Sequence, residues 1–294
     1  MKHPPAEIRR IVYLGTPALA VPPLVALHRA GFDIPLVVSR ADKRRGRGSE
    51  LSPSPVKAAA LELGIPVTTD VENALDVGAD IGVVVAFGRI IKPHVLDALP
   101  MVNLHFSLLP RWRGAAPVER AILAGDEITG VCLMALDVEL DTGDIYTVRE
   151  VSVGEKSLPD LRGELVEVGT EMLVEALTTG LPEPTPQVGD PVYAAKIDRD
   201  ELRLDWSDPA AQLARLVRLG DAWTTDDGRR LKVWQANVVE RSDLEPGQVN
   251  GVVVGAGTGA LELIEVQPEG KGRRSARDWA NGARLLPSDR LGAS

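Results

Sequence analysis

Ile81-Gly82-Val83-Val84-Val85-Ala86 is an apolar run without a single polar side chain. A strand with one face in water alternates polar and apolar residues, so an unbroken run is typical of a strand covered on both faces. Parallel sheets with helices on either side provide that environment. The run therefore predicts a central strand of an α/β domain.

Strand and helix patterns alternate on both sides of this run. Before it we expect strands at 10–15, 34–38 and 65–67, and helices at 18–30 and 56–63. After it we expect a strand at 131–136, a turn at 141–144 and a long amphipathic helix at 158–178. This rhythm predicts a doubly wound parallel sheet, a Rossmann-like architecture. Ligands of such sheets bind beyond the carboxyl ends of the strands, which directs attention to the loops after Leu14, Val38 and Ala86.

The pattern changes in the last third of the chain. Pro182, Pro184 and Pro186 stand close together, and prolines fix the backbone and remove hydrogen-bond donors. Beyond them a helix is expected at 210–219, followed by short strands at 231–239, 247–254 and 260–267 with glycine-rich turns between them. Many short strands in under a hundred residues favour a small β-barrel. We therefore predict a Rossmann-like domain at 1–180, a linker at 181–200 and a β-barrel domain at 201–294.

Composition indicates a soluble protein of a reducing compartment. The chain of 294 residues contains one cysteine, Cys132, which excludes an intramolecular disulfide and fits the cytoplasm. No apolar run approaches the roughly 20 residues that span a bilayer, so no membrane association is expected. The net charge of −9 disfavours a nucleic-acid partner at first sight. Residues 201–294, however, carry 13 basic and 14 acidic side chains, so the acidity lies mainly in residues 1–200.

Three polar residues are candidates for catalysis. Asn103 and His105 are two positions apart, which places both side chains on one face of an extended strand. An amide donor beside an imidazole suits a reaction that develops an oxyanion while a proton leaves an attacking nitrogen. Asp141, before a glycine turn, could orient His105. An isolated Asn-x-His is more often a satisfied strand end, and such an aspartate is usually a turn former.

The longer motifs resemble a known family. The Asn103-x-His105 pair, the tetrapeptide Ser107-Leu108-Leu109-Pro110 and the turn Asp141-Thr142-Gly143 resemble the 10-formyltetrahydrofolate-dependent formyltransferase superfamily. The string at 107–117, with the segments 14–17 and 53–57, is similar to the branch that formylates methionyl initiator tRNA. The resemblance covers nearly the whole chain and includes a C-terminal β-barrel of the oligonucleotide-binding (OB) type.

The resemblance implies a role for each motif. It implies 10-formyltetrahydrofolate as formyl donor and the amino group of methionyl initiator tRNA as acceptor. His105 would be the general base, Asn103 would hold the oxyanion, and Asp141 would pair with His105. It implies a folate pocket, lined in part by 136–140, that includes Phe87, Gly88, Arg89, Ile90, Ile91, Ser107, Leu108, Leu109 and Pro110. Arg47, in a basic glycine-containing loop, would approach the tRNA. We expect no metal, because the histidines lack ligand spacing, and we expect a monomer.

Other functions remain open from the sequence. The nearest alternative is an N-formyltransferase acting on an amino sugar nucleotide, which would share the Asn103, His105 and Asp141 group. An enzyme that hydrolyses or oxidises formylfolate would need further machinery, and a non-enzymatic nucleic-acid-binding module would leave the polar group unexplained. A nicotinamide-dependent enzyme is disfavoured, because Leu14-Gly15-Thr16-Pro17 lacks the glycine fingerprint of a dinucleotide site.

Overall fold

The computed structural model describes residues 3–44, 51–283, 286 and 289–292, which form two compact units. Unit 1 comprises Met1–Val118, Glu127–Ser152 and Leu161–Ala195, and unit 2 comprises Glu119–Asp126, Val153–Asp160 and Lys196–Ser294. No helix in the described residues is long and apolar enough to cross a membrane. The division into domains at 180 and 200 stays a prediction, and residues 181–195 belong to unit 1.

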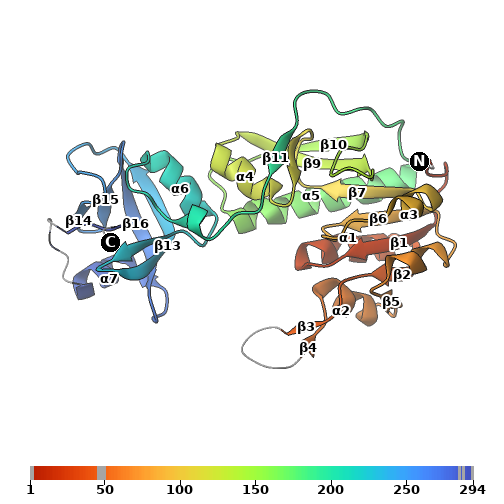
Figure 1. Ribbon diagram of the computed structural model, residues 1–294, viewed down its shortest axis with the longest axis horizontal. Coiled ribbons are helices and arrows are strands. Elements are labelled where there is room, and N and C mark those ends of the chain that lie inside the picture. The colour runs from red at the N-terminus through yellow and green to blue at the C-terminus, as the bar shows by residue number, and fades with distance from the viewer. Residues whose placement is uncertain (1–2, 45–50, 284–285, 287–288, 293–294) are drawn as a thin grey trace. The chain divides into compact units, whose positions relative to one another are not determined.

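A seven-stranded sheet in the order β10-β9-β7-β6-β1-β2-β5 is the frame of unit 1 (Figure 1). Its strands are β1 (Arg10–Gly15), β2 (Asp33–Val38), β5 (Val67–Thr68), β6 (Ile81–Val85), β7 (Met101–His105), β9 (Ile128–Ala135) and β10 (Ile145–Ser152). The strands from β7 to β5 run parallel, whereas β9 pairs antiparallel with β7 and with β10. The predicted α/β fold is confirmed, but the sheet is mixed, since β9 runs opposite to β7 and β10, its neighbours on either side.

The strand order reverses between β1 and β6, which makes the carboxyl ends of these two strands the switch point of the sheet. Their loops touch there, since the Thr16 hydroxyl donates to the Phe87 carbonyl oxygen at 3.2 Å. Arg40, after β2, donates to the carbonyl oxygen of Gly88. The loops expected to border a ligand site from the sequence therefore meet at one edge.

Helices cover both faces of this sheet. On one face α1 (Val21–Arg29) and α5 (Leu158–Thr179) lie side by side and line a shared groove. On the other face η2 (Val71–Leu75) and α3 (Pro93–Ala98) pack against β1, β2 and β6. The remaining helices of the first 130 residues are η1 (Ala18–Ala20), α2 (Pro55–Glu62) and α4 (Pro117–Ala124). This two-sided cover explains the unbroken apolar run at 81–86.

Two small strand pairs complete unit 1. β8 (Arg111–Gly114) pairs in parallel with β11 (Val192–Ala194), and β3 (Lys43–Arg44) pairs with β4 (Leu51–Ser52). The proline-containing segment before β11 is also bonded to unit 1, because Thr185 and Ile145 exchange backbone hydrogen bonds of 2.9 and 2.8 Å. The start of the predicted linker is therefore held against unit 1.

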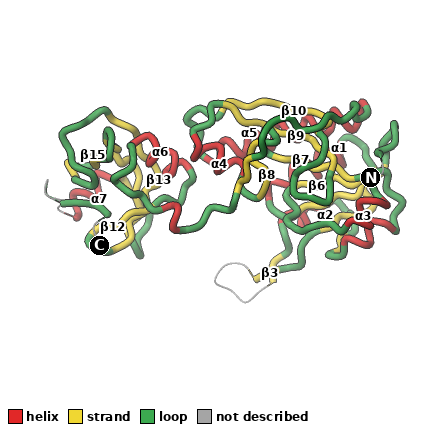
Figure 2. Tube along the Cα trace, turned by 45° about the horizontal axis from the view of Figure 1, so that its top comes forward, coloured by secondary structure: helices red, strands yellow, loops and turns green. Residues whose placement is uncertain are grey.

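Unit 2 contains a six-stranded antiparallel sheet covered by helices. Its path is β12-β13-β16-β15-β14, with β17 beside β16. α6 packs on β13 and β16, and α7 packs on β16 and β17. Figure 2 labels α6, α7, β12, β13 and β15 of this unit. The elements are η3 (Asp200–Leu202), α6 (Ala210–Arg218), β12 (Trp223–Asp226), β13 (Arg229–Val239), β14 (Val249–Asn250), β15 (Val253–Gly255), β16 (Ala260–Pro268), β17 (Arg274–Ser275) and α7 (Ala276–Ala283). The predicted strand at 247–254 is split in two by a turn at Gly251, whose φ is +65°.

The barrel itself stays a prediction, because the paired strands form an open path. Residues 289–292 nevertheless bond to both ends of that path. The Gly292 amide donates to Thr225 of β12 at 2.8 Å, and the Val249 amide of β14 donates to Asp289 at 3.0 Å. A closed or nearly closed barrel would require such a bridge between its edges.

The two glycines of α5 offer a test of the packing between helix and sheet. A Cβ on exposed Gly163 would meet nothing within 4 Å, whereas one on buried Gly169 would lie 3.1 Å from Val131 and 3.3 Å from Leu104. Gly163→Ala should raise the melting temperature by about 2–4 °C, since alanine in a helix interior is favoured by about 1 kcal/mol. Gly169→Ala should lower it, because overpacking costs typically 1–3 kcal/mol. Thermal unfolding followed by circular dichroism measures both, and equal gains would contradict the close approach of α5.

Candidate functional site

Strand β7 carries the two polar residues predicted from the Asn-x-His pattern. Leu104, between them, lies under α5 near Gly169, so Asn103 and His105 lie on the opposite face of the sheet. Both are nearly buried, with exposed fractions of 9% and 6%. The backbone alternation that packs Leu104 into the core thus brings an amide and an imidazole to one surface.

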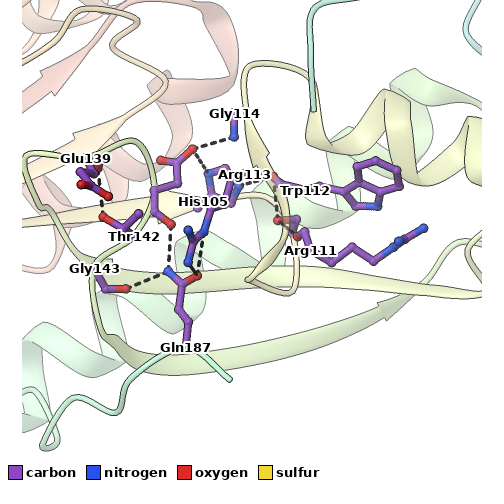
Figure 3. Close-up of polar contacts among 11 residues, drawn as sticks. His105, Arg111, Trp112, Arg113, Gly114, Glu139, Thr142, Gly143 and Gln187 are labelled. Atoms are coloured by element: carbon purple, nitrogen blue, oxygen red, sulfur yellow. Dashed lines mark hydrogen bonds and ion pairs between the residues drawn. The ribbon is translucent and has the colours of Figure 1, made fainter. Parts of the chain in front are cut away.

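His105 contacts a backbone carbonyl on one side and a carboxylate on the other (Figure 3). Its Nε2 lies 2.9 Å from the Trp112 carbonyl oxygen, and its Nδ1 lies 3.7 Å from Oδ2 of Asp141. A carbonyl oxygen only accepts hydrogen bonds, so Nε2 carries the proton in this contact. Nδ1 is then the nitrogen that can take up a second proton, and the nearby carboxylate would stabilise the resulting imidazolium.

Asp141 reaches His105 from the turn between β9 and β10. Its backbone is in the left-handed region, with φ of +53°, which an aspartate adopts more readily than most residues. Its Oδ2 accepts a hydrogen bond of 2.8 Å from the Gly114 amide, and the residue is 8% exposed. The structure therefore brings His105 and Asp141 together, although they are 36 positions apart in the sequence.

Asn103 differs from His105 and Asp141 in its hydrogen bonding. Its side-chain amide makes no hydrogen bond with any residue that the structure describes. Its amide atoms are not among the fully buried side-chain atoms that lack a partner, so they are accessible to solvent. An N–H donor left open two residues before the imidazole is available for a substrate oxygen.

The segment after β7 forms a tight turn above the antiparallel strands. Ser107 is fully buried, and its hydroxyl donates to the carbonyl oxygens of Arg111 at 2.8 Å and Trp112 at 3.3 Å. Leu109 packs on Cys132 and Met134 of β9. Leu108 and Pro110 are half-buried. The predicted pocket residues Ser107–Pro110 are thus next to the strand that carries Asn103 and His105, with their backbone held by the serine.

The predicted folate segment at 87–91 divides between core and surface. Phe87 and Ile91 are buried in the core between the sheet and α3, whereas Ile90 is 88% exposed. Arg89 donates to the Thr69 carbonyl oxygen at 2.7 Å. Core packing, the simpler interpretation of the apolar residues, therefore holds for Ile91 but not for Ile90.

The turn at 136–140 shows the same division. Leu136 is half-buried against that core, whereas Val138 and Leu140 are 56% and 62% exposed. Exposed apolar side chains on site loops are suited to a flat heterocycle. Whether these residues bind a ligand stays a prediction.

Several contacts of the site were not foreseen from the sequence. Gln187, in the proline-containing segment, bonds to Arg113 and to the turn that carries Asp141. The Trp112 carbonyl and the Gly114 amide are backbone groups, which no side-chain pattern reveals. A glutamine among prolines gives no periodic signal either. Arg47, the predicted tRNA contact, lies outside the described residues.

Histidine and carboxylate side chains also meet outside the candidate site. Within the described residues no group of three or more His, Cys, Asp or Glu side chains could hold a metal ion. His94 instead lies 2.7 Å from Glu72, and Lys92 lies 3.0 Å from the same carboxylate. The hydrogen bond with His94 lowers the pKa of Glu72 most, and the hydrogen bond with Lys92 lowers it further. The cluster is explained as an exposed ion pair.

Comparisons with known proteins find relatives over nearly the whole chain. The Formyl transferase family model matches residues 9–177, and the model described as Formyl transferase, C-terminal domain, matches residues 196–284. A methionyl-tRNA formyltransferase of Jannaschia sp. (strain CCS1) is 43% identical over 297 residues, which cover 95% of this chain and 98% of that protein.

Two solved structures share the fold. HypX from Aquifex aeolicus in complex with tetrahydrofolic acid has a TM-score of 0.66 at 16% identity, over 98% of this chain and 51% of HypX. An N-formyltransferase from Helicobacter canadensis, solved with folinic acid and dTDP-3-aminofucose, has a TM-score of 0.68 at 17% identity, over 87% of this chain and 99% of that one. At these identities the likeness concerns the fold alone.

The reactivity of the Cys132 thiol offers a test of the packing beside His105. It pairs with His105 across the β7–β9 ladder and is fully buried, and this burial raises the pKa of its thiol to about 11. Roughly one thiol in a thousand is then ionised at pH 8, and only the thiolate reacts. We expect the folded protein to resist alkylation and the urea-unfolded protein to take up one label per chain. Rapid labelling of the folded protein would contradict the buried position.

Proposed function

Since the chain belongs to the formyl transferase family, we propose that it transfers a formyl group from 10-formyltetrahydrofolate to the amino group of methionyl initiator tRNA. The observation that carries the proposal is the convergence of Asn103, His105 and Asp141 at the end of β7 in a chain 43% identical to a methionyl-tRNA formyltransferase. The transfer would supply the formylated initiator for translation.

The three side chains have complementary tasks in this reaction. The amine nitrogen attacks the formyl carbon, a new C–N bond forms, and the formyl oxygen becomes an oxyanion. The open amide of Asn103 donates to that oxygen, which is the type of contact that stabilises such transition states most strongly. His105 takes the proton from the amine at Nδ1 and passes it to the folate nitrogen that leaves as the old C–N bond breaks.

Asp141 makes this proton transfer favourable. Its carboxylate lies 3.7 Å from Nδ1, too far for a direct hydrogen bond but close enough to stabilise the imidazolium electrostatically. The hydrogen bond from Gly114 holds Oδ2 in place. His105 is thereby held between the carboxylate and the Trp112 carbonyl, which fixes the plane of its ring.

The folate donor would bind at the loops beside Asn103, His105 and Asp141. Phe87, Gly88, Arg89, Ile90 and Ile91 would line the pterin pocket with Ser107, Leu108, Leu109 and Pro110. Since the side chains of Phe87 and Ile91 are committed to the core, these two would contribute backbone groups, and Ile90 would contribute its exposed side chain. Val138 and Leu140, whose side chains are also exposed, would form an apolar side of the pterin pocket.

A basic–aromatic face on unit 2 supports a nucleic-acid acceptor. It consists of Arg203, Trp223, Arg230, Lys232, Trp234 and Arg273. Arg230 lies 4.0 Å from the Trp223 ring and Arg273 lies 3.3 Å from the Trp234 ring. Arginine and aromatic planes in alternation bind phosphates and stack on bases. Lys232 and Arg273 are also paired with Asp221 and Glu265, so Arg203 and Arg230 would contribute most to phosphate binding.

The remaining assignments follow from the same function. We infer a cytoplasmic, monomeric enzyme without a metal, with a catalytic domain at 1–180, a linker at 181–200 and an OB-like domain at 201–294. Arg47 would add a contact to the tRNA from unit 1. The alternative acceptor is an amino sugar nucleotide, and direct assay of formyl transfer to both acceptors separates the two functions.

Replacing the catalytic side chains tests the chemistry. His105→Ala and Asn103→Ala should each lower kcat about a hundredfold or more, since each removes a general base or an oxyanion contact. Affinity for the folate should change little, because the pterin lies on other loops. His28→Ala, an exposed histidine of α1, is the matched control and should keep full activity. Wild-type turnover in either site variant would refute the assignment.

The acceptor is tested by salt dependence. Each phosphate contact that is lost should reduce the slope of log affinity against log salt by roughly 0.7 to 0.9. Arg230→Gln and Arg47→Ala should therefore weaken tRNA use and flatten this slope without affecting the folate. Arg241→Gln, whose guanidinium is already paired with Asp243, is the control. A flat wild-type curve would exclude tRNA as acceptor, since a sugar nucleotide carries only a diphosphate.

A further inference from the structure

Gln187 is the half-buried residue of an exposed stretch. Its neighbours Thr185, Pro186 and Val188 are exposed, Val188 at 88%. Gln187 alone turns inward, and its side chain takes part in four hydrogen bonds. Ordering a long polar side chain in this way loses rotamer entropy, so the contacts must compensate for it.

These four hydrogen bonds join two parts of the site (Figure 3). Nε2 of Gln187 donates to the carbonyl oxygens of Asp141 and Gly143, both at 2.9 Å. Oε1 accepts from Nε and Nη2 of Arg113 at 3.0 and 2.7 Å. A guanidinium only donates and a carbonyl only accepts, so the partners leave one orientation for the amide.

The carbonyls that Gln187 holds belong to the turn that presents the catalytic carboxylate. Asp141 has a φ of +53°, a conformation that persists only where surrounding contacts determine it. Its carboxylate is fixed on the other side by the Gly114 amide, one residue after Arg113. Gln187 therefore acts on the backbone of Asp141, and through Arg113 on the strand whose amide holds its side chain.

We propose that Gln187 is a positioning residue for catalysis, which sets the distance between Asp141 and His105 by clamping the turn at 141–143 to β8. The inference rests on the proposed function, since it concerns the carboxylate that serves His105. It assigns a task in the reaction to the segment before β11, which is otherwise a connection toward unit 2. A turn displaced by about 1 Å would lower turnover severely.

Gln187→Glu separates this task from a merely structural one. The glutamate keeps the shape and the contact with Arg113, but it presents an oxygen to two carbonyl oxygens. If Gln187 only anchored its own segment, an ion pair with Arg113 would serve equally well. If the Nε2 group of Gln187 positions the turn, kcat of Gln187→Glu should fall about tenfold or more, as in Gln187→Ala. The KM of the folate should change little. Val188→Ala is the control and should keep full activity.

A double-variant measurement identifies the path of the effect. In an Asp141→Asn background the substitution Gln187→Glu should reduce kcat by less than twofold, because the group it positions has already been neutralised. Additive losses would overturn the proposal, and so would wild-type kcat in Gln187→Glu. Melting temperatures guard against misfolding, and faster amide exchange at 141–143 in Gln187→Glu reports the loosened turn independently of activity. If the wild type does not transfer the formyl group, the proposed function is refuted. If the wild type is active and Gln187→Glu has the same kcat, only this inference is refuted.

Discussion

Side chains alternate across the sheet at β7, and this alternation links the core to the site. Leu104 packs under α5 beside Val131, so Asn103 and His105 must lie on the opposite face. A register slip of one residue would bury the imidazole against the helix and expose the leucine. The buried neighbours of β7 on β6 and β9 exclude such a slip. The most apolar part of the protein therefore determines where its polar chemistry is placed.

The buried carboxylate of Asp141 is a second constraint on the fold, because it requires polar partners. A carboxylate that is 8% exposed is costly unless charged or hydrogen-bonding partners surround it. The Gly114 amide and the His105 ring provide these partners, while Gln187 bonds to the main-chain carbonyl of Asp141, so three separate segments meet at this residue. The site is consequently an assembly of turns held by backbone hydrogen bonds, rather than a cluster of side chains on one rigid element. The short pair β8–β11 joins two of these segments.

The fold was largely predictable because its signals are local. The expected strands at 10–15, 34–38 and 81–86 correspond to β1, β2 and β6, and the helix at 158–178 corresponds to α5. Some elements were missed, among them α4, β8, β10 and β12. The half-polar strand β10 lies at the sheet edge, where an exposed face weakens the apolar pattern. Antiparallel pairing of β9 depends on partners distant in sequence, so no local pattern predicted it.

By itself the sequence determined the α/β frame, the proline-marked change of pattern and the residues Asn103, His105 and Asp141, since periodicity and side-chain chemistry are written in the chain. Only the tertiary structure decided that Asp141 lies beside His105, that Ile91 is core while Ile90 is exposed, and that Gln187 and the Gly114 amide hold the turn. The reason is physical. Propensity and patterning act over a few residues, whereas the partner of a buried polar group is chosen by whichever distant segment the packing brings within about 3 Å.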